Sequence, residues 1–249
     1  MDNNPNDFQD CDKADLSSQA EYSFGWELFE FKIHDEILQE LIDITDKVLN
    51  DKENSQSHNP ALAGRIESEF TITHEMMGDK IIDYFTQVLE AYAQFQINTI
   101  NSKRYDMLPE ELDVDWNTVE PYIEGAWVNQ MYKYEYNPVH SHVNAMLSSV
   151  LFLKVPDLDS SNIGNGDVNK PNREKKDGWI SFVDCNHQFC EENDCGDTKV
   201  ARTKSIKPEP GMFYLFPASL LHTVYPFDCE GERRSFAFNV LFRHKENNG

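Results

Sequence analysis

The chain has 249 residues, 39% of them hydrophobic, and carries 44 acidic against 22 basic residues, for a formal net charge of −22. This length suits one medium-sized domain, and the hydrophobic content argues against wholesale disorder. An acidic surface repels phosphate backbones and anionic lipids, so we expect neither a nucleic-acid nor a membrane partner. Because the polar N-terminus lacks the features of a signal peptide, we expect a cytoplasmic protein.

The N-terminal half is predicted to contain a tail, one strand and two helices. Residues 1–21 are acidic and polar, which predicts a flexible tail ahead of one domain over residues 22–249. The aromatic-rich segment 22–33 predicts a strand. Apolar residues at helical spacing predict helices over residues 35–50 and 80–95, and a turn-rich stretch follows up to residue 120.

The C-terminal half has a different character, because short apolar runs alternate with turn signals. This pattern predicts an antiparallel sandwich or barrel. Polar insertions at 160–177 and 186–199 are predicted to be exposed loops near a mouth. The predicted strands are 122–136, 146–155, 179–183, 203–206, 212–216, 222–225 and 233–242.

Three of the eight histidines form a candidate metal site. His140 and His142 are separated by one residue, and His222 begins another predicted strand. Residues i and i+2 of a strand point to the same face, so both imidazoles of the first pair can reach one point. A barrel or sandwich can bring His222 to the same place. Three neutral nitrogen ligands with open positions suit a catalytic divalent metal, and a polar strand surface is the alternative interpretation.

The strand predicted after His222 carries a candidate anion site. Arg233 and Ser235 share one face, and Arg234, Phe236 and Phe238 share the other. The phenylalanine face is expected to pack on neighbouring structure, so Arg233 points inward. An inward arginine is costly unless it meets an anion, and a guanidinium beside a hydroxyl suits a carboxylate. A dicarboxylate could therefore bind the metal at one end and Arg233 at the other; an internal ion pair is the alternative.

Together, these residues resemble a known family. Residues 127–242 resemble a bacterial and phage-type family of 2-oxoglutarate/iron(II)-dependent oxygenases with an HxH…H…RxS motif. The order and spacing of all the matching pieces agree, which is more specific than HxH alone. The matching stretches are HSH at 140–142, LSSVLFLKVP at 147–156, PEPGMFYLFP at 208–217, LH at 221–222, RRS at 233–235 and FAFN at 236–239.

The resemblance implies a mainly β fold with flanking helices, a double-stranded β-helix of the jelly-roll or cupin-like kind. Within the domain, it implies a helical lead-in over 22–120 and a jelly-roll core over 121–249. It implies iron(II) at His140, His142 and His222, with 2-oxoglutarate as co-substrate on Arg233 and Ser235.

The broader superfamily usually has a carboxylate two residues after the first histidine, where this chain has His142. Three ligand sets therefore remain open. We favour the three histidines. The set could instead shift to His142 and Asn144, or a carboxylate such as Asp184 could complete it from another strand.

The resemblance implies a dioxygenase that couples dioxygen and 2-oxoglutarate to hydroxylation of a substrate C–H bond, with release of succinate and CO2. We expect the substrate to be a peptidyl side chain or a small molecule, and the location to be a cytoplasm, the host's for a phage-encoded chain. One competing hypothesis is a cupin-like module without turnover. Another is an iron oxygenase that does not use 2-oxoglutarate, against which Arg233 argues.

Other polar and aromatic groups are weaker candidates. A zinc site in the cysteine-containing loop lacks paired CxxC spacing, so free thiols are expected at Cys185, Cys190 and Cys195, near His187. Four histidines lie in polar surroundings and are expected on the surface: His34, His58, His74 and His244. Two rows near the predicted site could line a pocket: Asn129, Met131 and Lys133, or Tyr132, Tyr134 and Tyr136.

Overall fold

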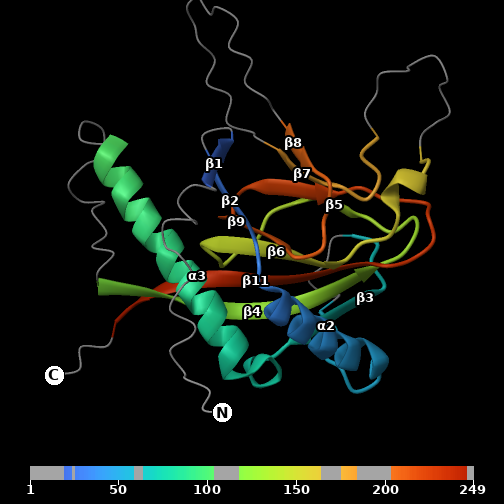
Figure 1. Ribbon diagram of the computed structural model, residues 1–249, viewed down its shortest axis with the longest axis horizontal. Coiled ribbons are helices and arrows are strands. Elements are labelled where there is room, and N and C mark those ends of the chain that lie inside the picture. The colour runs from blue at the N-terminus through green and yellow to red at the C-terminus, as the bar shows by residue number, and fades with distance from the viewer. Residues whose placement is uncertain are drawn as a thin grey trace, which may run out of the picture.

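Two antiparallel sheets and two helices make up the fold in the computed structural model (Figure 1), which describes residues 20–23, 26–58, 64–103, 118–163, 175–183 and 203–245. The larger sheet contains β1 (Ala20–Ser23), β2 (Trp26–Lys32), β9 (Met212–Pro217), β6 (Leu147–Lys154), β11 (Arg233–His244), β4 (Val119–Met131) and β3 (Ser68–Ile72), in that spatial order. The smaller sheet has the order β5 (Asn137–His140), β10 (Leu221–Val224), β7 (Ile180–Val183) and β8 (Thr203–Ile206).

The helices α2 (Asp35–Asn50) and α3 (His74–Lys103) lie against one face of the larger sheet (Figure 1), and a short 3-10 helix, η4, spans Leu158–Ser160. The bounds of α2 confirm the prediction. The predicted start of the second helix falls just after Gly78, whose φ of 70° interrupts α3. Its predicted end at residue 95 is wrong, because no glycine or proline stops the helix before Lys103.

The predicted strands of the C-terminal half are all present; β8 has the predicted bounds, and the others differ at one or both ends. The predicted strand over 122–136 is the most displaced, since β4 begins at Val119 and ends at Met131. The predicted strand over 22–33 consists of β1 and β2, and β1 takes in the last two residues of the expected tail. Residues 1–19 lie outside the described residues. No strand was predicted at β3, which has five residues, begins with Ser68 and Glu69, and joins the edge of the larger sheet.

The larger sheet separates two hydrophobic cores because its strands alternate between its faces. One core lies between this sheet and the helices, where Phe236 and Phe238 of β11 pack near Phe85 of α3. The other lies between the two sheets, where Phe152 and Phe216 face Phe182 of the smaller sheet. The two-faced pattern predicted for β11 is confirmed, since Arg233 and Ser235 point away from the phenylalanine face.

A buried arginine on the helix side ties α2 to the larger sheet. Arg234 is 3% exposed and donates to Thr45 Oγ1 at 3.0 Å and to Asp46 Oδ1 at 2.6 Å, both on α2. It also donates to Glu232 Oε1 at 2.9 Å. Separating a buried charge from its partners costs free energy, so the network fixes the position of α2 on the sheet.

Among the described residues, no helix is both long enough and apolar enough to cross a membrane.

We expect Arg234→Ala to lower the free energy of unfolding by about 3 kcal/mol, because it removes the buried cation of the network and leaves Asp46 and Glu232 with the partly exposed Lys154. The measurement is urea denaturation followed by circular dichroism. Arg243→Ala is the matched control, since Arg243 is on the same strand and pairs with Glu120 at 2.7 Å in an exposed setting. It should cost less than about 1 kcal/mol. Equal losses in the two variants would contradict this account of the network.

Candidate metal centre and its pocket

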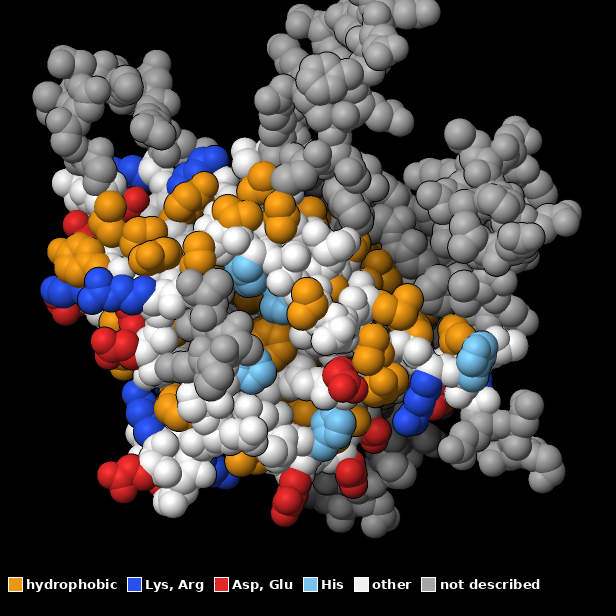
Figure 2. Space-filling view, turned by 180° about the vertical axis from the view of Figure 1, so that it is seen from behind, with side chains coloured by type: hydrophobic (Ala, Val, Ile, Leu, Met, Phe, Trp, Pro, Cys, Tyr) orange, Lys and Arg blue, Asp and Glu red, His pale blue; other side chains and the backbone are white. Residues whose placement is uncertain are grey.

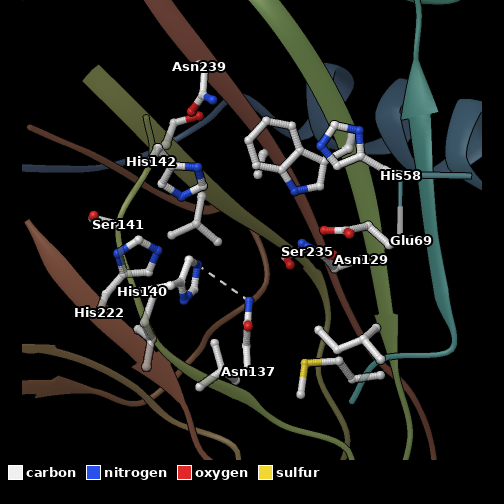
Figure 3. Close-up of a pocket in the computed structure, with 18 of the residues that line it drawn as sticks. His58, Glu69, Asn129, Asn137, His140, Ser141, His142, His222, Ser235 and Asn239 are labelled. Carbon is white, nitrogen blue, oxygen red and sulfur yellow. Dashed lines mark hydrogen bonds between the residues drawn. The ribbon is translucent and has the colours of Figure 1, made fainter. Parts of the chain in front are cut away.

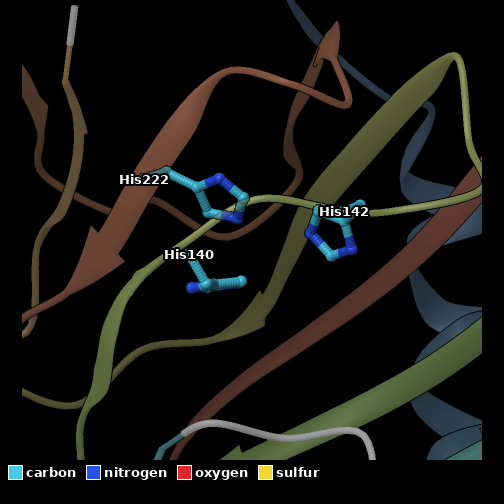
Figure 4. Close-up of side chains that lie close together, drawn as sticks. All are labelled: His140, His142 and His222. Atoms are coloured by element: carbon cyan, nitrogen blue, oxygen red, sulfur yellow. The ribbon is translucent and has the colours of Figure 1, made fainter. Parts of the chain in front are cut away.

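Antiparallel pairing of β5 with β10 brings the candidate metal ligands together. His222 lies directly opposite His140 in the register of the two strands, and their ring centroids are 4.2 Å apart. His142 lies beyond the end of β5, where its backbone N–H donates to the carbonyl of Ala218 at 2.9 Å. The ligand-capable atoms of the three imidazoles all lie within 4.8 Å of one another (Figure 4). The predicted convergence is confirmed, although His142 reaches the point from a loop.

Backbone carbonyls fix the orientation of two of these rings. His140 Nδ1 lies 2.8 Å from the carbonyl of Pro138, and His222 Nδ1 lies 3.0 Å from the carbonyl of Leu220. A carbonyl only accepts, so each Nδ1 carries the proton and each Nε2 keeps its lone pair for a metal. Asn137 Nδ2, on β5, lies 3.4 Å from His140 Nε2, and a bound metal would take the place of this weak contact at the Nε2 lone pair. His140 and His222 are therefore pre-oriented as ligands.

The surroundings keep the imidazoles neutral. Burial, together with the neighbouring His140, lowers the pKa of His222 to about 3. Phe216 contributes to this burial, with its ring 5.0 Å from that of His222. Burial also lowers the pKa of His142 to about 4, and the pKa of His140 is lowered for the same reason. A metal ion therefore meets three unprotonated rings at neutral pH and displaces no protons from them.

Arg233 is a buried cation without an anion among the described residues. Its side chain is 1% exposed; Nε donates to the carbonyl of Gly178 at 3.0 Å, and Nη1 approaches the sulfur of Met131 at 3.5 Å. The guanidinium lies over the Phe152 ring at 5.0 Å, and its Nη2 has no hydrogen-bond partner among the residues that the structure describes. Burial lowers its pKa to about 10, so it stays charged at neutral pH. An internal ion pair, the alternative considered for this residue, is absent from the described part of the chain.

One cavity of about 310 Å³ joins the histidines to Arg233 and Ser235. Its floor is the face of the larger sheet that looks toward the smaller sheet, and histidine side chains are visible in a hollow of the molecular face shown in Figure 2. Exposed hydrophobic side chains surround the segment that carries the first two ligands: Tyr136, Val139, Val143 and Met146. The cavity is within the size range of small-molecule sites, and its opening is bordered by apolar side chains.

The cavity also contains an acidic group that the sequence did not single out. Glu69 is 3% exposed, and burial raises its pKa to about 7. With its amide oriented to suit both neighbours, Asn129 donates to Glu69 Oε1 at 2.7 Å and accepts from Trp127 Nε1 at 3.2 Å. Glu69 Oε2 has no hydrogen-bond partner within the described part of the chain. In Figure 3, Glu69, Asn129 and His58 lie across the pocket from the three candidate ligands.

The structure sorts the weaker candidates. His58 was expected on the surface, and this is wrong: it stacks on Trp127 at a centroid distance of 5.1 Å and lines the cavity. Asn129 and Met131 line the cavity, but Lys133 does not, because β4 ends before it and it pairs with Glu230 outside.

The row of Tyr132, Tyr134 and Tyr136 is exposed, because β4 has already ended at Met131. Asn144 is exposed and outside the cavity lining, with a φ of 59°. Asp184 and the cysteine-containing loop lie outside the described residues. His34, His74 and His244 are exposed, as expected. His34 contacts the ring of Tyr84, and His74 bonds to the carbonyl of Ile123.

Residues 125–239 match the model of the family described as "Putative 2OG-Fe(II) oxygenase". This part of the chain is therefore similar to the 2-oxoglutarate/iron(II) oxygenases. The match contains β11 up to Asn239 and all three candidate ligands. None of the curated proteins matches the chain.

Solved structures of oxygenases are similar in fold. The epimerase SnoN from nogalamycin biosynthesis has a TM-score of 0.52 at 8% identity, over 95% of this chain and 84% of its own. The carbocyclase SnoK from the same biosynthesis has a TM-score of 0.50 at 8% identity, over 92% and 83%. A Pseudomonas putida prolyl-4-hydroxylase has a TM-score of 0.48 at 13% identity, over 94% and 97%. The two antiparallel sheets and the likeness to SnoN and SnoK confirm the expected double-stranded β-helix.

The residues present fit the groups that this family uses. Three neutral imidazoles with two fixed tautomers suit iron(II), for which nitrogen ligands are common. The unpartnered Nη2 of Arg233 suits the distal carboxylate of 2-oxoglutarate, because a buried guanidinium binds a carboxylate strongly.

We expect His142→Ala to lower iron(II) affinity at least tenfold, because its imidazole faces the same point as the other two. Asn144→Gly is the control for the shifted ligand set, and glycine accepts the positive φ of that position. The measurement is anaerobic calorimetric titration of iron(II). Retained affinity in His142→Ala with loss in Asn144→Gly would show that the three-histidine set is wrong.

We expect Glu69→Gln to stabilise the metal-free protein increasingly as pH rises. The folded-state pKa of Glu69 is raised above its usual 4.5, so the folded chain keeps a proton that the unfolded chain releases. Wild-type stability from this group therefore falls between about pH 4.5 and 7. The difference between variant and wild type should grow by roughly 2–3 kcal/mol over that window.

The measurement is urea denaturation with a chelator present. Glu67→Gln is the control, because Glu67 is exposed two residues earlier, and its difference from wild type should change by less than about 0.5 kcal/mol. A pH-independent difference for Glu69→Gln would contradict the raised pKa.

Proposed function

We propose that this oxygenase hydroxylates a C–H bond of a peptidyl side chain or small molecule, with iron(II) on His140, His142 and His222. In this proposal, Arg233 and Ser235 hold 2-oxoglutarate, which is converted to succinate and CO2 as dioxygen is consumed. The family match supports the reaction class. The arrangement of the residues in one cavity supports the roles assigned to them.

The observation that carries the proposal is the unpaired guanidinium of Arg233. A fully buried cation without an anion is unstable relative to one that has found a carboxylate. The cavity that contains Arg233 also contains three imidazoles that can hold a metal. A ligand with a carboxylate at one end and a metal-chelating keto acid at the other satisfies both groups at once, and 2-oxoglutarate has this structure.

Each residue then has a defined task. Bound iron(II) with 2-oxoglutarate supplies the oxidising chemistry, while the protein supplies an open coordination site and orientation. The Nε2 atoms of His140 and His222 would hold the metal, because their Nδ1 protons are bonded to backbone carbonyls. Arg233 fixes the far carboxylate, and Ser235 adds a hydroxyl on the same strand face. Phe182 and Phe216 exclude water from the His222 side.

The decisive test is anaerobic calorimetric titration of iron(II), then of 2-oxoglutarate, into wild-type protein and single variants. We expect Arg233→Met to lower 2-oxoglutarate affinity at least tenfold while iron affinity changes less than twofold, because the residue contacts only the distal carboxylate. His222→Ala should lower iron affinity at least tenfold. Arg243→Met, exposed at the other end of β11, should change neither value.

Substrate-uncoupled succinate release in air, followed by chromatography, adds a functional readout to the same variants. Wild-type protein that binds iron(II) but not 2-oxoglutarate would favour an iron oxygenase of another kind. Wild-type protein that binds neither would favour a cupin-like module without turnover. Unchanged binding in both Arg233→Met and His222→Ala would show that the site assignment is wrong.

A further inference from the structure

Glu69 is a second buried ionisable group in the cavity, and none of the described residues gives it a cationic partner. One carboxyl oxygen accepts from Asn129, and the other has no hydrogen-bond partner in the described part of the chain. None of the ion pairs formed among residues 20–23, 26–58, 64–103, 118–163, 175–183 and 203–245 includes it. A buried carboxylate in this state gains most from a ligand that brings N–H donors and positive charge.

Strand register places Glu69 away from the proposed co-substrate position. Ser235 of β11 lies opposite Asn129 of β4, and Asn129 lies opposite Glu69 of β3. Neighbouring strands are about 4.8 Å apart, so Glu69 lies roughly 10 Å across the floor from Ser235. The distal carboxylate of 2-oxoglutarate and a group bound at Glu69 can therefore occupy the cavity together.

Two features argue against Glu69 as a further metal ligand. The group of side chains that can hold an ion contains the three histidines and not this carboxylate. Its nearest polar partner is the Asn129 amide, which uses its N–H as a donor toward Glu69 and so presents no second ligand atom there.

The net charge of the chain favours a cationic ligand. At −22, it draws cations rather than anions toward the mouth of the cavity.

A flat aromatic wall leads from Glu69 to the metal site. Trp127 lies two residues before Asn129 on the same face of β4 and stacks parallel to His58. Its ring centroid is 5.6 Å from that of His142, and its indole N–H is joined to Glu69 through the Asn129 amide. An aliphatic stem lying along this wall would have its head at Glu69 and its body beside the metal.

We propose that Glu69 binds a positively charged group of the substrate, a protonated amine or a guanidinium, and so directs a nearby C–H bond toward the metal. This inference rests on the proposed function, because the C–H bond is directed toward the iron that the three histidines are proposed to hold. The substrate class is then a cationic small molecule or a lysine- or arginine-type side chain. Glu69 is a specificity-determining residue in this scheme and has no part in holding iron(II) or 2-oxoglutarate.

The test uses protein loaded anaerobically with iron(II) and 2-oxoglutarate and two probes of nearly the same shape, n-butylguanidinium and neutral n-butylurea. We expect calorimetry to show that wild-type protein binds the guanidinium at least tenfold more tightly than the urea. Glu69→Gln should reduce this preference to less than twofold while keeping its affinity for iron(II) and 2-oxoglutarate. Glu67→Gln removes one exposed charge nearby and should keep the preference.

Equal binding of the two probes by wild-type protein would overturn the proposal and would point to a neutral substrate group. A preference that survives in Glu69→Gln would also overturn it, because the charge would then act from elsewhere. The wild-type comparison needs no variant, so it decides even if Glu69→Gln does not fold. Failure of the proposed function is separate: it would appear as absent 2-oxoglutarate binding, and the probe preference can still be measured with metal-free protein.

Discussion

The candidate metal centre depends on the register of β5 against β10. Antiparallel pairing sets His140 opposite His222, two residues that are far apart in the chain. A one-residue slip would turn one imidazole to the other side of the sheet, since side chains alternate along a strand. His142 is placed by the same arrangement, because its backbone N–H bonds to Ala218 in the turn that precedes β10. The pairing therefore positions all three rings.

Unbalanced charge is the second constraint on the cavity. Arg233 and Glu69 both project into it from the larger sheet, yet they stand on strands β11 and β3, which β4 separates. The two cannot neutralise one another without leaving the strand positions that hold them. Each is held in the folded chain at a cost that packing elsewhere offsets. The cavity is thereby prepared for a ligand with a carboxylate and, in our inference, for a second one with a cation.

The stability of the surrounding structure comes from the other side of the same sheet. There, Phe236 and Phe238 of β11 pack against the helices, and Arg234 is neutralised by partners on α2 and in the preceding turn. Consecutive residues of β11 thus alternate between the core beside the helices, where Arg234 has anionic partners, and the cavity, where Arg233 has none among the described residues. This alternation was readable in the sequence, and so was α2, because both follow from local periodicity with buried apolar side chains.

The sequence by itself determined that a mainly β chain would carry three histidines and an inward Arg233 near Ser235, because these signals lie within single strands or their immediate neighbours. Only the tertiary structure decided that His142 would reach the metal from a loop, and that Glu69 and His58 would line the same cavity. These two residues belong to a short edge strand and the segment paired with it, where five residues carry too little periodicity to predict burial. Their environment is created by β4, which lies more than forty residues further along the chain and whose pairing with β3 no local pattern specifies.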